Sequence, residues 1–165
     1  MATSAFLNEA YLAYFGRPVD LTGSIYFANK TEAEVEAAFS SSTESQALYG
    51  TAVTPDFINS IYTNVIGRPA EPAGITFWLT QIANGAVTPA GAALAILNAA
   101  QLTDDATTVN NKLASSTLFS SSVDTTAEIL GYRGDAAAAQ ARSFLAGVTT
   151  TVATQAEVDA AVAAT

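Results

Sequence analysis

Two copies of one short motif, Gly-Arg-Pro-x-acid-x-x-Gly, hold the residues best suited to chemistry in this chain. The first copy occupies residues 16–23 and the second residues 67–74, at an offset of 51 residues. Each arginine offers a planar fork of hydrogen-bond donors that suits a carboxylate or a sugar. Arg17 and Arg68 are therefore candidate glycan-binding residues. The remaining motif residues are expected to shape the loops: Gly16, Asp20 and Gly23 in the first copy, and Gly67, Glu71 and Gly74 in the second.

The same motif has a purely structural interpretation, which we favour. Each arginine would pair with the acid of its own loop and cap a carbonyl of the preceding helix. Gly23 and Gly74, which lack a Cβ, would let two helices approach closely. A motif that recurs where the chain must turn sharply is more easily explained by geometry than by ligand binding.

Aromatic side chains form the second set of candidates, because sugars stack on exposed aromatic faces and Tyr and Trp add a polar group. Small residues surround Tyr14 and Tyr49, which we therefore expect to be the most exposed. The alternative is that the aromatics fill a core otherwise rich in alanine, and their helical spacing favours this alternative. The glycan-binding candidates are Tyr14, Tyr26, Tyr49 and Trp78, with Tyr11, Phe27 and Phe77 as further aromatics at the repeats.

Acidic residues could bind calcium, which takes oxygen ligands. Asp104 with Asp105, and Glu34 with Glu36, are the candidate pairs, but neither shows the spaced Asp-x-Asp-x-Asp-Gly loop. The alternative is that these acids compensate helix dipoles at N-termini on a solvated face. The sequence assigns no metal ligands, and calcium remains only an optional assisting ion.

The composition argues against catalysis. The chain contains no His and no Cys, which removes Ser–His and Cys–His triads, disulfides and ordinary zinc sites. No carboxylate pair lies on a motif that would form a pocket, and the glycines do not form a phosphate-binding loop. We therefore expect a protein that is not an enzyme. The sequence assigns no cofactor with certainty.

Charge and hydropathy limit the partners. The formal net charge is −9, so nucleic acid is not an expected partner and anionic lipid headgroups are disfavoured. No apolar run approaches the ~18 residues of a membrane span, so membrane insertion is not expected. No secretory signal peptide is visible at the start. If the parent protein is exported, we expect its secretion signal elsewhere, such as a C-terminal signal for type I secretion.

The elements that must position these residues are helices throughout. In the first copy, a helix ends at Gly16, a second spans 21–29 behind the N-cap Asp20, and a third begins at Thr31. In the second copy, helices begin at Pro55 and Pro72, and a third begins at Thr88-Pro89. The polar stretch Ser40–Ser45 is expected to be a loop. Further helices are expected from Asp104 through Phe119 and over 124–130, 135–147 and 154–164.

These elements predict an all-α fold, a compact multi-helix bundle of two helix-loop-helix repeats and a C-terminal helical segment. We expect one domain over residues 1–165. Within it, the first repeat spans 1–50, the second 51–102 and the C-terminal helical part 103–165.

The two motif copies resemble a bacterial domain of unknown function with a Gly-Arg-x-Pro-Asp-x-x-Gly-x-x-x-Trp pattern. That domain occurs in tandem at the N-terminus of S-layer proteins and calcium-repeat (RTX-type) exported proteins. The second copy is the closer one, with Phe77-Trp78 in the aromatic positions. The first copy has Phe27 at the tryptophan position, and the proline comes one residue early in both copies.

The resemblance implies an extracellular, cell-surface module of a Gram-negative S-layer-like protein. Such N-terminal regions anchor the lattice to the O-antigen of lipopolysaccharide, with calcium as an assisting ion. A second possibility is a self-assembly module that contacts further copies of the parent protein in the lattice without binding glycan. A glycan-processing enzyme is the third and weakest possibility.

Overall fold

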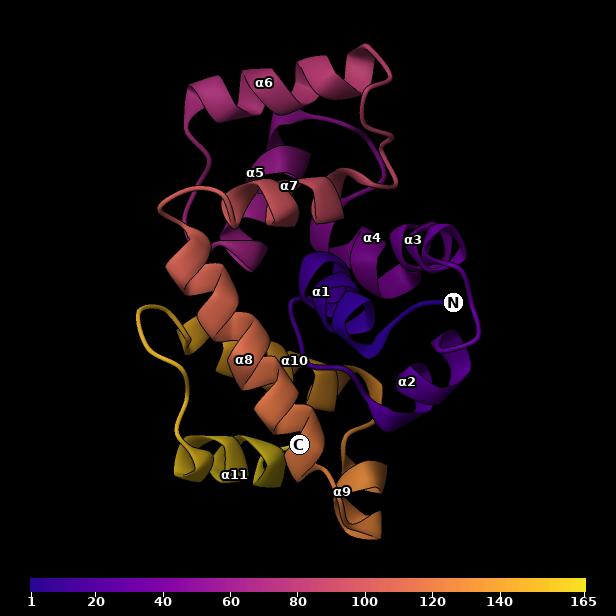
Figure 1. Cartoon of the computed structure of the whole chain (residues 1–165), viewed down its shortest axis with the longest axis vertical. Helices are drawn as coiled ribbons and strands as arrows, with labels where there is room; N and C mark the ends of the chain where they lie inside the picture. The colour runs from indigo at the N-terminus through magenta and orange to yellow at the C-terminus, as the bar shows by residue number, and fades with distance from the viewer.

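The computed structural model describes residues 1–165 and contains helices and no strands, so the predicted all-α fold is confirmed (Figure 1). Helix α6 lies at one end of the molecule, and α9 and α11 lie at the other. The helices are α1 Ser4–Phe15, α2 Leu21–Phe27, α3 Glu32–Ser40, α4 Thr43–Tyr49, α5 Pro55–Val65, α6 Pro72–Ala83, α7 Ala92–Ala100, α8 Ala106–Ser122, α9 Thr126–Gly131, α10 Gly134–Gly147 and α11 Gln155–Ala163.

The internal repeat pairs α1 with α5, α2 with α6 and α4 with α7, and it leaves α3 without a counterpart. Two predictions are therefore wrong. Residues 88–91 form a turn rather than a helix start, and α7 begins at Ala92. The stretch Ser40–Ser45 is not only a loop, because α4 begins at Thr43, where the Ser42 side chain accepts a hydrogen bond from the Ser45 amide.

Helix α1 is the centre of the fold and packs against α3, α4, α5, α7 and α8. It has no solvent-facing stripe over its second half, since every residue from Ala10 to Phe15 is buried. Ala10 and Ala13 are completely buried, and their small side chains let neighbouring helices approach closely. The large apolar residues around them complete one core shared by both repeats.

A second, smaller cluster of buried residues lies under the C-terminal helices. It contains Phe119, Tyr132, Ala137, Ala141, Val158 and Val162. Phe144 and Ala153 pack against both clusters and connect them. Helix α8, the longest in the chain, runs from the second repeat toward α9 and α11 and so joins the two parts (Figure 1).

The helix ends follow the capping signals in the sequence. Gly16 takes the left-handed conformation with φ of 64° and its amide bonds to the Leu12 carbonyl, which ends α1. Thr31, Thr125 and Thr154 each form a capping box with the glutamate three residues later. No helix combines the length and the apolar composition that crossing a membrane would require.

Candidate functional site

The loop between α1 and α2 is organised around the carboxylate of Asp20. Its Oδ1 accepts a hydrogen bond of 2.7 Å from the Gly23 amide and so caps α2. Its Oδ2 accepts hydrogen bonds from the Tyr11 hydroxyl at 3.1 Å and from Arg17 Nη1 at 3.2 Å. Both oxygens are thus engaged within the protein, and the carboxylate fixes the start of α2 relative to α1.

Gly23 lies directly against the Tyr11 hydroxyl. A Cβ built at residue 23 would overlap that oxygen, so the close approach of α1 and α2 requires glycine. Burial raises the pKa of Tyr11, and the neighbouring Asp20 charge raises it further, so the hydroxyl stays a donor. The expectation that Gly23 lets two helices approach closely is confirmed.

Arg17 extends this loop into a buried network. Its Nε and Nη2 atoms donate to Glu44 at the start of α4, at 2.8 Å and 3.0 Å, while Nη1 contacts the Tyr132 hydroxyl at 3.3 Å. Burial alone would lower the pKa of Arg17, but hydrogen bonds to Glu44 and the nearby Tyr132 raise it overall. Arg142 also donates to Glu44, at 2.7 Å, which ties α10 to the same carboxylate.

The second repeat builds the same loop. Arg68 Nη1 donates to Glu71 at 2.6 Å and to the Pro69 carbonyl at 3.1 Å. Its Nε and Nη2 form a fork on Asp105 at 2.9 Å and 2.8 Å. Each motif arginine therefore binds its own loop acid with one nitrogen and a distant acid with the other two. The distant acid comes from α4 in the first repeat and from the N-cap of α8 in the second.

These contacts decide between the two interpretations of the motif. The predicted pairing of Arg17 with Asp20 and of Arg68 with Glu71 is confirmed. The predicted capping of the preceding helix by the same arginine is wrong, because the Phe15 carbonyl at the end of α1 is bonded by Arg142 at 2.7 Å. Both motif loops therefore have internal ion pairs. The first is bonded throughout its Arg17 and Asp20 groups, whereas in the second Arg68 is 37% and Glu71 63% exposed, and Glu71 makes no cap to α6.

The predicted exposure of Tyr14 and Tyr49 is wrong, since they are only 2% and 7% exposed. The Tyr14 hydroxyl donates to the Ala90 carbonyl. The Tyr49 hydroxyl donates to the Ala13 carbonyl at 2.7 Å and accepts from Asn64 at 2.6 Å. Small neighbours let other helices close over these rings, so small flanking residues indicate tight packing here rather than exposure.

Trp78 is also buried and is not available to a sugar. Its Nε1 donates to the Tyr62 hydroxyl at 3.0 Å. Its neighbour Phe77 packs edge-on against it at 5.0 Å between ring centroids and remains 52% exposed. In α6 the inner aromatic of the pair anchors the helix and the outer one reaches solvent.

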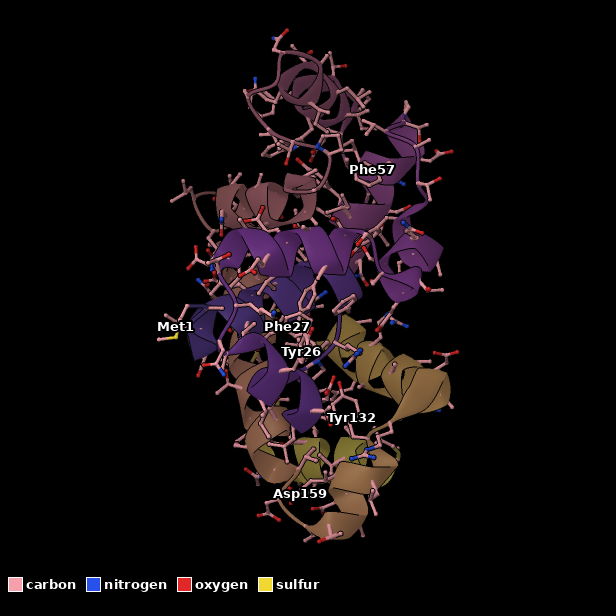
Figure 2. The ribbon with its side chains drawn as sticks, turned by 90° about the vertical axis from the view of Figure 1, so that its right-hand side faces the viewer. Met1, Tyr26, Phe27, Phe57, Tyr132 and Asp159 are labelled. Atoms are coloured by element: carbon pink, nitrogen blue, oxygen red, sulfur yellow. The ribbon has the colours of Figure 1, made fainter.

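Tyr26 is the glycan-binding candidate that the structure leaves accessible. It is 62% exposed and packs edge-on against Phe27, with 4.8 Å between the centroids (Figure 2). It is equivalent to Phe77 in the repeat. Leu21 and Ile25 on the same helix are 45% and 65% exposed. We call Leu21, Ile25 and Tyr26 the α2 face: three large exposed side chains on a helix of seven residues, of which Leu21 and Ile25 lie one turn apart while Tyr26 projects from another side of the helix.

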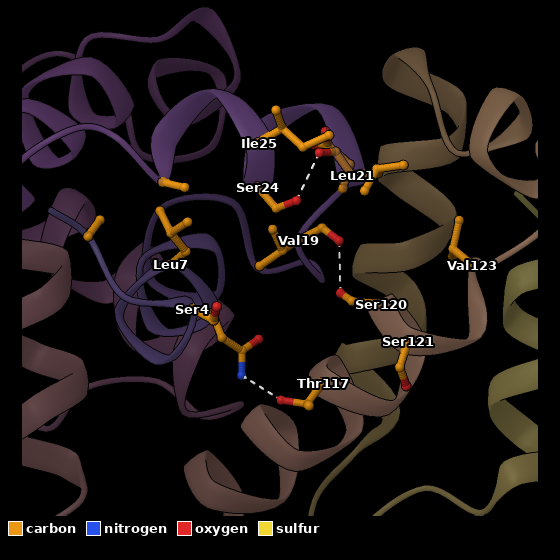
Figure 3. A pocket seen from close by; sticks show the side chains of 14 residues that line it. Ser4, Leu7, Val19, Leu21, Ser24, Ile25, Thr117, Ser120, Ser121 and Val123 are labelled. Atoms are coloured by element: carbon orange, nitrogen blue, oxygen red, sulfur yellow. Dashed lines mark hydrogen bonds between the residues drawn. The ribbon is translucent and has the colours of Figure 1, made fainter.

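A groove borders the α2 face, between α2, the start of α1 and the end of α8 (Figure 3). Its volume is about 510 Å³, within the range of small-molecule sites. Leu7, Val19 and Val123 line it together with Leu21 and Ile25 from the α2 face. None of the five main hollows has a wall from α6, which packs mainly against α5. The sequence gives no signal for this groove, because its walls come from three segments far apart in the chain.

One member of each acidic pair has a structural partner. Asp105 holds Arg68, and Glu34 closes the capping box of Thr31, whose amide and hydroxyl lower the pKa of Glu34. No group of three or more acidic side chains lies close enough together to hold a metal ion.

Residues 36–104 match the model of a family described as "Domain of unknown function (DUF4214)". The matched region contains the second motif copy and helices α4 to α7. No curated protein and no solved structure matches the chain.

Proposed function

We propose that this chain is a non-catalytic anchoring module of an S-layer-like protein on the surface of a Gram-negative bacterium. It would bind the O-antigen polysaccharide of lipopolysaccharide through the α2 face. The observation that carries the proposal is the exposure of Leu21, Ile25 and Tyr26 on one short helix, with Leu21 and Ile25 lining a groove, while the loop carboxylate Asp20 is fully bonded within the protein.

The motif loops supply rigidity for this surface. Gly23 against Tyr11 and the N-cap Asp20 hold α2 in one position on α1. The Arg17 fork then ties the same loop to Glu44. A surface fixed before binding loses less conformational entropy when a ligand arrives, which favours affinity from a small contact area.

The chemistry of the α2 face suits a sugar. Pyranose rings have one face of C–H groups, which pack on an aromatic ring or on aliphatic side chains, and hydroxyls that remain in water. Tyr26 offers a ring with a polar hydroxyl at its edge. Lys30 lies 5.5 Å from this ring and adds one donor beside it. Calcium enters the proposal only as a bridge between single carboxylates of the protein and anionic groups of the lipopolysaccharide.

Co-sedimentation with lipopolysaccharide tests this proposal. The full chain is mixed with smooth lipopolysaccharide, which carries O-antigen, and with rough lipopolysaccharide, which lacks it, each with and without a chelator. We expect binding to the smooth form alone. Tyr26→Ala should reduce that binding, because it removes the aromatic ring that would contact the sugar. The fold should be unaffected, because the ring lies outside the core.

Phe77→Ala is the matched control for this experiment. It removes an exposed ring from the equivalent position of the other repeat, with the same edge-on neighbour but no groove. It should bind like the unmodified chain. The proposal is wrong if smooth lipopolysaccharide fails to bind under both conditions, or if the two alanine variants behave alike.

Self-assembly is the second candidate function, and the α2 face is the observation in its favour. Exposed apolar residues beside a hollow are also what a protein interface uses. Under this alternative Leu21 and Ile25 would contact another copy of the parent protein in the lattice. Sedimentation velocity at rising concentration separates the two, since only self-assembly predicts oligomers without glycan.

A glycan-processing enzyme is the least supported candidate. Glycoside hydrolysis uses a pair of carboxylates on either side of the scissile bond. Asp20 is the one ionisable group that lines the groove, and its oxygens are bound by Tyr11, Arg17 and Gly23. A glycan-release assay with smooth lipopolysaccharide checks this point.

A further inference from the structure

We infer that the groove between α1, α2 and α8 binds one uncharged sugar residue and so makes the protein selective for neutral over acidic glycans. This inference rests on the proposed function, because it takes the sugar to be part of the bound polysaccharide. It adds to the proposed function the chemical class of that sugar and the groove that determines the selectivity for it.

The groove offers no positive charge to an acidic ligand. No Lys or Arg lines it, and its single ionisable residue is Asp20. That carboxylate is already bonded within the loop and ion-paired with Arg17, so the groove offers an anionic ligand no partner of opposite charge. The net charge of −9 acts in the same direction at longer range. A uronic acid would therefore be disfavoured relative to a neutral sugar.

The hydroxyls on the groove wall are mostly acceptors. Ser24 donates its proton to the Leu21 carbonyl, and Ser120 donates to the Val19 carbonyl, each at 2.8 Å (Figure 3). Ser121 donates to the Leu118 carbonyl, also at 2.8 Å. A serine oxygen that has given its proton still has lone pairs free. The three serine oxygens around the groove can therefore accept hydrogen bonds, which favours a ligand that donates them.

The amide in the groove adds no donor. Asn8 Nδ2 donates to the Leu113 carbonyl at 3.0 Å and to Thr117 Oγ1 at 3.1 Å, so both protons are used. Thr117 itself donates to the Leu113 carbonyl. Ser4 is the one lining hydroxyl with no bonded partner. A ligand rich in carbonyls, such as an extended peptide, would leave most of its acceptors without donors, at a cost for each one buried.

Sugar hydroxyls fit this lining because each can rotate to act as a donor. The apolar part of the groove, formed by Leu7, Val19 and Ile25, would face the C–H side of the ring. A groove of about 510 Å³ accommodates one sugar residue and part of the next. The remaining chain would pass around α2 to reach Tyr26, which does not line the groove.

NMR titration of the full chain with simple glycosides tests the inference. The neutral probes are the methyl glycosides of glucose, galactose and mannose, and the acidic probe is methyl glucuronide. We expect at least one neutral glycoside to shift amide signals within residues 21–28 and 117–123, and the glucuronide to shift neither segment.

Ser121→Ala and Ser122→Ala form a matched pair for this titration. Both hydroxyls donate to the Leu118 carbonyl in the same turn of α8, but only Ser121 lines the groove. Loss of one hydrogen bond at Ser121 should weaken the neutral glycoside about fivefold. Ser122→Ala should leave its affinity unchanged, although it removes the acceptor of Gln155.

The outcomes separate this inference from the proposed function. If smooth lipopolysaccharide binds but no neutral glycoside shifts the groove, or the glucuronide binds equally well, the inference is wrong and the function stands. Equal effects of the two serine variants would also overturn it. If a neutral glycoside binds in the groove but smooth lipopolysaccharide does not bind, the groove assignment stands and the proposed function fails.

Discussion

The backbone of Gly23 in α2 packs against the hydroxyl of Tyr11 in α1 so closely that no side chain fits between them. The same hydroxyl donates to Asp20, which caps α2. One oxygen atom therefore sets both the distance between the two helices and the start of the second one. The proposed binding surface depends on this contact, because the α2 face points outward only while α2 lies in this position.

Gly23→Ala should destabilise the fold more than Gly74→Ala. At Gly23 a methyl group overlaps the Tyr11 hydroxyl, whereas at Gly74 the nearest atom, the Tyr62 hydroxyl, is 3.1 Å away and can move slightly. We expect Gly23→Ala to lower the free energy of unfolding by about 1–3 kcal/mol. For Gly74→Ala the gain in helix propensity offsets most of the loss. Urea unfolding followed by circular dichroism measures both.

Tyr11→Phe provides the control for this comparison. Without the hydroxyl the worst overlap at residue 23 is removed, although the ring carbon Cζ still lies 2.9 Å from the added Cβ. The double variant Tyr11→Phe with Gly23→Ala should therefore lose less than the sum of the single changes. Strict additivity would show that the Gly23 and Tyr11 contact does not limit the approach of the helices.

Glu44→Ala should cost more stability than Asp105→Ala. Glu44 holds Arg17, whose side chain is 12% exposed, and also Arg142. Its loss removes the two-nitrogen fork on Arg17, which keeps only Asp20 as an acidic partner, and leaves Arg142 with no acidic partner. Asp105 holds only Arg68, which is 37% exposed and can be hydrated. We expect a loss of about 2–4 kcal/mol for Glu44→Ala and a clearly smaller one for Asp105→Ala. Equal losses in thermal unfolding would contradict the proposed role of the network.

Lys112→Met tests a buried cation. Lys112 is 1% exposed, and its Nζ donates to the Asn64 carbonyl at 3.1 Å, with no acidic partner. Burial lowers the pKa of Lys112 to about 8 from its usual 10.5. Below pH 8 the folded protein therefore keeps a charge that would be better hydrated in the unfolded chain. At pH 7 we expect Lys112→Met to be as stable as the unmodified protein or more stable.

The pH dependence follows from the lowered pKa of Lys112. Between pH 8 and 10.5 the folded state releases its proton before the unfolded state does, so the stability of the unmodified protein rises with pH. Relative to Lys112→Met, this rise should approach about 3 kcal/mol. Buried tyrosines such as Tyr132, whose pKa burial raises to about 12, lower stability above pH 10 in both proteins and cancel in the difference. A flat difference over this range would contradict the account.

Much of the fold could be predicted because helix-capping residues and the helical spacing of apolar residues are local signals. Thr31, Thr125 and Thr154 mark helix starts through residues three positions away. The sequence does not predict helix α4, because its first turn is polar, although Ser42 followed by Glu44 is an acceptable N-terminal signal. It predicts a helix start at the turn 88–91, because Thr-Pro is also a common helix start.

The candidate site was harder to predict, because its contacts are tertiary. The pairing of Arg17 with Asp20 is local and was predicted, but its second acid, Glu44, lies on another helix. The burial of Tyr49 depends on α1, α5 and α10, which no neighbouring residue in the sequence indicates. The groove arises only when the end of α8 comes beside α2.

Hydrogen exchange of the full chain with smooth lipopolysaccharide tests the central claim most directly. The α2 face and the groove wall should become protected, which means slower exchange in residues 21–28 and 117–123. The equivalent segment of the second repeat, residues 72–83, should exchange at an unchanged rate. Protection of both repeats alike, or protection elsewhere with none in α2, would contradict the assignment of α2 as the binding helix.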